Sequence, residues 1–124
     1  MMVVLKSIVV PTLRKKGFVG SFPHFRRIKT GQIDVMSFQF DKWGGGFVVE
    51  ISKCGPEGVT MSWGEKVPPK KVTAQHLNPN NRLRLGCEGP NSDHWFRYDR
   101  GKSPEMVAHE VVDNLDRAEK WWAV

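Results

Sequence analysis

Two apolar stretches with a period of two flank three consecutive glycines, and this pattern restricts the fold more than any other feature of the chain. The first stretch, residues 33–40, reads IDVMSFQF, and the second, residues 47–52, reads FVVEIS. Alternation is typical of β-strands, because successive side chains point to opposite faces of a sheet. Glycines at positions 44–46 can supply the positive φ angles of a hairpin turn or a bulge. We therefore predict an antiparallel hairpin that turns at residues 44–46.

The same three glycines raise the question of a phosphate-binding loop. Dinucleotide-binding loops have Gly-x-Gly-x-x-Gly between a strand and a helix, and nucleoside-triphosphate loops have Gly-Lys-Ser/Thr at the start of a helix. Here the glycines precede the strand-like residues Phe47–Ile51. A turn is therefore favoured over a phosphate site, and we predict no cofactor.

Four other segments have strand character and are separated by turn residues. They are FPHFRRIK at 22–29, VTMSW at 59–63, RLRLGC at 82–87 and HWFRYD at 94–99. Thr30-Gly31, residues 54–59 and residues 88–93 are predicted as turns. Residues 64–81 contain three prolines and have no period, apart from a short helix expected around 72–77. Such a stretch is often functional or mobile, and we mark 64–81 as a candidate mobile loop.

A helix is predicted at each end of the chain. Ser103 is a good N-cap, Pro104 suits the first helical position, and one apolar face follows, formed by Val107, Val111, Leu115, Ala118 and Trp122. Near the start of the chain, Val4, Ile8 and Leu13 recur at helical spacing, and basic residues precede Gly17 as a C-terminal signal. Pro11 is expected to kink this first helix or divide it.

These elements predict an α+β fold: a twisted antiparallel sheet of about five strands covered by the N- and C-terminal helices. The length of 124 residues fits a single domain, residues 1–124.

The net charge of +6 is unevenly distributed. Residues 1–33 contain seven Lys or Arg and no acidic residue, whereas residues 103–124 contain five acidic and two basic residues. A basic segment of this kind attracts nucleic acid or pairs with acidic residues of its own chain. Dedicated nucleic-acid-binding domains are usually more basic, so the internal or merely solvated alternative is favoured.

Two cysteines do not make a disulfide framework, and the N-terminal residues lack the pattern of a secretion signal. No apolar run approaches the roughly 20 residues that span a bilayer. We therefore expect a cytoplasmic protein without membrane contact. No local pair of His or Cys residues has zinc-site spacing, and the Ser, Asp and His of SDHW (92–95) are adjacent rather than arranged as a triad. No metal site and no catalytic residue are predicted.

Five segments together resemble a bacterial domain-of-unknown-function family, number four-three-zero-four. They are LRKKGF at 13–18, FRR at 25–27, VMSFQFDKWGGGF at 35–47, RLRLG at 82–86 and DHWF at 93–96. Their order and spacing extend over nearly the whole chain. The resemblance implies an α+β domain and implies no activity.

Arginines and aromatic residues on the predicted strands form the candidate binding surface. Its members are Arg26, Arg27, Gln39, Trp43, Arg82, Arg84, Trp95 and Arg97. Arginine with aromatic residues is the composition of protein-interaction hot spots, and it also suits single-stranded nucleic acid. The alternative is a solvated sheet face with cross-strand ion pairs to Glu50 and Asp34.

We therefore predict a small, uncharacterised binding or protein-interaction domain of unknown partner, and another protein is favoured over a nucleic acid. A nucleic-acid-binding module is the second hypothesis, and an enzyme of unknown type is the third.

Overall fold

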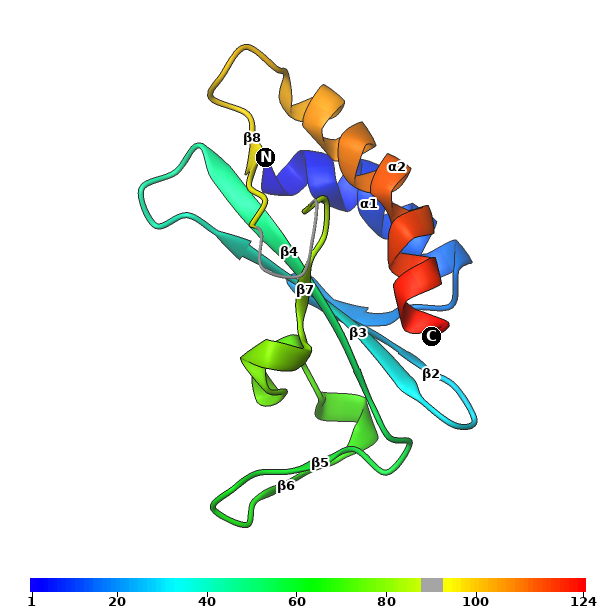
Figure 1. The fold of residues 1–124 in the computed structure, drawn as a ribbon. Coiled ribbons are helices and arrows are strands. Elements are labelled where there is room, and N and C mark those ends of the chain that lie inside the picture. Colours follow the sequence, from blue (N-terminus) through cyan, green and yellow to red (C-terminus); the bar gives the residue numbers. More distant parts are fainter. Residues whose placement is uncertain (88–92) are drawn as a thin grey trace.

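The computed structural model describes residues 1–87 and 93–124 and shows two helices on one face of an antiparallel sheet (Figure 1). Helix α1 spans Met2–Lys15 and helix α2 spans Pro104–Trp122. Both helices contribute apolar side chains to the main hydrophobic core, which they share with the sheet. The α+β prediction, with a sheet covered by the terminal helices, is confirmed.

The main sheet has six strands in the described part of the chain, one more than the sequence predicts. Their order is β1-β2-β3-β4-β7, and β8 also pairs with β4. The strands span Val19–Ser21 (β1), His24–Ile28 (β2), Ile33–Phe40 (β3), Gly46–Cys54 (β4), Leu83–Arg84 (β7) and Phe96–Arg97 (β8). The extra strand is β1, whose sequence VGS has no apolar alternation to reveal it.

The predicted hairpin is the centre of this sheet. Strands β3 and β4 pair antiparallel along their length, with Phe40 opposite Phe47 next to the turn. Gly44 and Gly45 have φ angles of +83° and +82°, which favour glycine over any L residue. The amide of Asp41 donates to the carbonyl of Gly46 at 2.9 Å and closes the turn. The glycines therefore form a turn between strands, as predicted.

The helix ends follow the predicted signals. The hydroxyl of Ser103 accepts a hydrogen bond from the amide of Met106 at 3.2 Å, which caps α2. Gly17 has a φ of +94° just beyond α1, where the left-handed conformation ends a helix. Pro11 lies inside α1 and does not divide it, so α1 is one helix.

A second, two-stranded sheet extends from the body of the molecule (Figure 1). It consists of β5 (Val59–Thr60) and β6 (Lys66–Val67), so only two residues of the predicted strand 59–63 are extended. Three 3-10 helices follow, at Pro69–Lys71, Ala74–His76 and Pro79–Asn81. The short helix expected at 72–77 is thus a single 3-10 turn. Of the turn predicted at 88–93, residues 88–92 lie outside the described part.

The sheet buries apolar residues on both faces. Met36 and Phe38 belong to the core under the helices, whereas Ile33 and Val35 belong to a smaller cluster with Val72. This division confirms the predicted alternation of residues 33–40. The segment that follows β6 lies on the side of the sheet away from α1 and α2 (Figure 1). It covers that face at the Ile33 end of β3, while Gln39 at the other end is exposed.

Candidate interaction surface

Arg27 lies on the helix-covered face of the sheet. Its guanidinium pairs with Asp34 at 2.9 Å and with Glu119 of α2 at 2.6 Å, and it stacks 4.6 Å from the ring centroid of Phe18. Burial alone would lower the pKa of Arg27, but the hydrogen bonds to Glu119 and Asp34 raise it. This arginine therefore connects the sheet to α2. Its neighbour on β2, Arg26, points to the opposite face of the sheet.

The pairing with Glu119 also bears on the uneven charge distribution. Arg27 belongs to the basic first part of the chain, and Glu119 belongs to the acidic last part. At this contact the two parts meet inside the protein, as the internal alternative proposed.

Arg26 and Arg82 lie on the helix-free face and hold the segment after β6. Arg26 Nε donates to the carbonyl of Val72 at 3.0 Å. Arg82 donates to the carbonyls of Leu77 and Gln75, at 2.8 and 3.2 Å, from Nη2, and its Nη1 pairs with Glu50 at 3.2 Å. Both guanidinium groups therefore attach the segment of 3-10 turns to the sheet.

A row of polar side chains crosses four strands of the same face. His24, Ser37, Glu50 and Arg84 are successive register partners on β2, β3, β4 and β7. His24 Nδ1 and Ser37 Oγ are 2.8 Å apart, and Arg84 Nε lies 3.0 Å from a Glu50 oxygen. Arg84 also pairs with Asp93 at 3.1 Å.

The ion pairs to Glu50 and Asp34 that the sequence offers as an alternative are thus present. The pair between His24 and Ser37 was not predicted. The sequence does contain a sign of this pair. Ser37 lies between the apolar residues Met36 and Phe38 of β3, and a buried polar side chain requires a polar partner on a neighbouring strand.

The remaining candidates gather at the end of the sheet beside the β3–β4 turn, and we call Gln39, Trp43, Trp95 and Arg97 the turn-end patch. Trp43 is 84% exposed, and Trp95 is 36% exposed with the guanidinium of Arg97 5.7 Å from its ring centroid. Asp41 connects Trp43 to Arg97. One of its oxygens accepts a hydrogen bond from the backbone amide of Trp43 at 2.9 Å, and the other lies 3.8 Å from Arg97 Nη1.

The strand register places two members of this patch, Gln39 and Arg97, on the helix-free face. Arg97 is opposite Gly46, Gln39 is opposite Val48, and Arg84 is opposite Glu50. Alternate positions on β4 share a face, so the two arginines and Gln39 surround Val48 on one side of the sheet. Arg84 therefore borders the turn-end patch.

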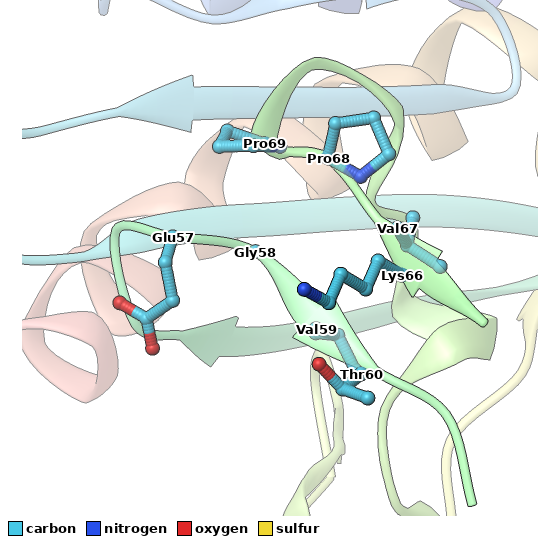
Figure 2. A pocket seen from close by; sticks show the side chains of 8 residues that line it. All are labelled: Glu57, Gly58, Val59, Thr60, Lys66, Val67, Pro68 and Pro69. Atoms are coloured by element: carbon cyan, nitrogen blue, oxygen red, sulfur yellow. The ribbon is translucent and has the colours of Figure 1, made fainter. Parts of the chain in front are cut away.

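Two hollows lie near the β5–β6 hairpin. One, of about 570 Å³, runs beside the hairpin, and Figure 2 shows Glu57, Thr60 and Lys66 around it with Pro68 and Pro69. The other, also about 570 Å³, lies between the hairpin and the 3-10 turns, and His76 and Arg82 line it.

No group of three or more His, Cys, Asp or Glu in residues 1–87 and 93–124 is arranged to hold a metal ion. Cys54 and Cys87 are both free thiols. Burial and the nearby Glu57 raise the pKa of the Cys54 thiol, which disfavours the reactive thiolate. Of the SDHW segment, Ser92 lies outside the described residues.

Across the described residues, no helix has both the length and the apolar character required to cross a membrane. Searches of curated proteins and of solved structures found no significant match to the chain. The sequence model of the family described as "Domain of unknown function (DUF4304)" matches residues 9–124. With its two terminal helices on an antiparallel sheet and this match over nearly its whole length, the chain belongs to the DUF4304 family.

Proposed function

We propose that this protein is a small, non-enzymatic protein-binding domain and that the turn-end patch is its contact surface. The observation that carries the proposal is the exposure of Trp43, 84%, at the turn beside the Trp95–Arg97 stack. Large aromatic rings are usually withdrawn from water, and Trp and Arg are the residues that contribute most binding energy in protein interfaces. A hairpin turn fixed by β3 and β4 presents Trp43, and the pairing of β8 with β4 places Arg97 next to it, so binding costs little conformational entropy.

The ion pairs of the arginines favour a protein partner over a nucleic acid. Arg82 and Arg84 pair with Glu50, and Arg97 lies within 3.8 Å of Asp41 and 3.7 Å of Asp99. Binding to single strands requires cations that are available to phosphate groups. A phosphate at this surface would have to displace carboxylates that already neutralise the guanidinium groups.

The two free thiols agree with the reducing cytoplasm as the compartment that we propose. We therefore search for the partner in a cytoplasmic lysate.

The proposal is tested by affinity capture from a nuclease-treated cytoplasmic lysate of the source organism, followed by mass spectrometry. The bait is the full chain, compared with the Trp43→Ala/Arg97→Ala variant. Trp63→Ala is the matched control, because Trp63 is 70% exposed at the tip of the other hairpin and lies outside the patch. We expect one protein in stoichiometric amount with the wild type and the control, and its loss with the double variant.

Three results would contradict the proposal. One is capture of the same protein by all three baits, and another is the absence of any stoichiometric protein. The third is binding of single-stranded DNA or RNA at physiological salt that is lost in a folded Arg82→Ala/Arg84→Ala variant. That last result would establish the nucleic-acid hypothesis instead.

A further inference from the structure

Three basic side chains on the helix-free face carry hydrogen-bond donors that the turn-end patch does not use. His24 and Arg26 are two residues apart on β2, so both side chains lie on this face. His76 belongs to the 3-10 turn Ala74–His76, whose Ala74 packs against Ile33 and Val35 on the same face. All three are half-buried.

The tautomer of His76 is fixed by its backbone neighbour. The amide of Thr73 donates to His76 Nδ1 at 3.0 Å, so Nδ1 accepts. In the neutral ring the proton is then on Nε2, which becomes a donor available for a ligand. His24 Nδ1 lies 2.8 Å from Ser37 Oγ, a hydroxyl that can donate or accept, so this contact leaves the tautomer of the neutral His24 ring open. In the protonated ring Nδ1 donates to Ser37 and Nε2 is a second donor.

Arg26 has spare donors of the same kind. Its Nε donates to the carbonyl of Val72, which leaves both terminal nitrogens for other acceptors. No carboxylate among residues 1–87 and 93–124 forms an ion pair with Arg26. Glu50, an acid on the same face, is already paired with Arg82 and Arg84. Within the described residues the cluster therefore has the positive charge of Arg26 and no compensating anion.

A cavity on the hairpin side is lined by one member of the cluster, His76. Its volume is about 570 Å³, and its polar lining residues are Thr60, Ser62, Gln75, His76, Asn78 and Arg82. His76 belongs to both the cavity and the cluster. A small molecule in the cavity thus reaches a donor of the cluster with one of its ends.

We propose that His24, Arg26 and His76 form a binding site for an oxyanion, the phosphate, sulfate or carboxylate group of a small molecule held in the adjoining cavity. The guanidinium and the Nε2–H of His76 are donors, the His24 ring adds a further donor when it is protonated, and an oxyanion offers only acceptors. The bound anion compensates the positive charge that the described residues leave unpaired. This site is separate from the turn-end patch and is independent of the protein partner proposed there.

The electrostatics predict how binding depends on pH. Burial, then Arg26, then His76 lower the pKa of His24, so its ring is neutral at pH 7. An anion in the site favours the charged imidazolium and raises the pKa of His24. By linkage, the affinity for the anion increases as the pH falls and His24 becomes protonated. The charged groups on or beside the neighbouring strands of this face are Glu50, Arg82 and Arg84, and Glu50 pairs with both arginines.

The test uses inorganic sulfate as the probe, because sulfate keeps its charge while histidine titrates. The pKa of each histidine ring is measured by NMR in sulfate and in sodium chloride of equal ionic strength. We expect sulfate to raise the pKa of His24 and His76 by about one unit, the effect of an opposite charge in contact. His109 is an internal control, because it is exposed on α2 and its pKa should not change.

Arg26→Gln should abolish most of this effect of sulfate, and Arg100→Gln, which removes the same charge from an exposed position, should not. Glutamine retains an N–H donor for the carbonyl of Val72, so the fold should be preserved. Equal shifts of all four histidines, or no shift of His24 and His76, would overturn the proposal. The measurement on the wild type decides this even if the Arg26 variant does not fold.

Discussion

The carboxylate of Asp34 is fully buried and is held by several side chains at once. Arg27 and Lys29 lie 2.9 and 2.8 Å from one of its oxygens, and the Gln32 amide donates to the other. Gln32 also donates to the carbonyl of Trp122 in the last turn of α2, at 2.8 Å. One buried carboxylate therefore connects β2, β3 and the end of α2.

Replacement of Asp34 by Asn should destabilise the fold strongly. The change removes the charge that compensates Arg27 and Lys29, and removal of one partner from a buried ion pair typically costs about 3–5 kcal/mol. Glu119 still pairs with Arg27, so we expect the lower end of that range in the free energy of unfolding, measured with urea. Asp99→Asn is the control, since its side chain is 46% exposed and its loss should cost less than about 1 kcal/mol. Equal stability of the two variants would show that Asp34 does not hold the elements together.

His24 should make stability depend on pH. Its folded pKa is lowered from 6.5 by burial first and then by Arg26 and His76, so the unfolded chain binds the proton more readily. The free energy of unfolding therefore decreases as the pH falls from neutral through 6.5 toward the lower folded pKa. Urea unfolding across this range should show a smaller decrease for His24→Gln than for the wild type or for His109→Gln. An unchanged slope in His24→Gln would contradict the lowered pKa.

At the scale of elements, the long strands and both helices could be predicted because their own residues encode them. The alternation of residues 33–40 and the cap formed by Ser103 and Pro104 are local signals. The strands of two residues, such as β7 and β8, are different, because each is defined only by its pairing with the edge of β4. A two-residue strand has no period of its own, so its extent could not be predicted.

The β5–β6 hairpin supplies a test at this scale. Gly58 has a φ of +92°, and a Cβ there would lie 2.3 Å from the carbonyl oxygen of Val67, which is backbone and cannot move aside. Gly64 has a similar φ of +93° but open space around it. Gly58→Ala should therefore separate β5 from β6, whereas Gly64→Ala should add only backbone strain of about 1–2 kcal/mol.

The measurement for this pair is hydrogen exchange of the amide of Met61, which donates to the carbonyl of Glu65 at 2.7 Å within the hairpin. We expect its protection to be lost in Gly58→Ala and largely kept in Gly64→Ala. Loss of protection in both variants to the same extent would mean that φ alone, and not the contact with Val67, controls the hairpin.

At the scale of the whole molecule, the candidate surface was predicted in composition but not in arrangement. Arg26 and Arg27 are neighbours on β2, and neighbours on a strand point to opposite faces. This rule separates them from the sequence alone, but it does not say that α2 covers the face of Arg27. That depends on the packing of Glu119 against it, a contact between residues 92 positions apart. The stacking of Arg97 on Trp95 beside the turn also depends on the pairing of β8 with β4.

The most direct test of the account is the affinity of the captured protein for variants in which one tryptophan is replaced by alanine, measured by isothermal titration calorimetry at physiological salt. The account predicts that Trp43→Ala weakens binding by about 2 kcal/mol, about thirtyfold, as expected for a hot-spot residue. Trp63→Ala, which removes an equally large exposed ring from the other hairpin, should bind like the wild type. Full affinity in Trp43→Ala, or a loss that appears only in Trp63→Ala, would contradict the assignment of the turn-end patch as the contact surface.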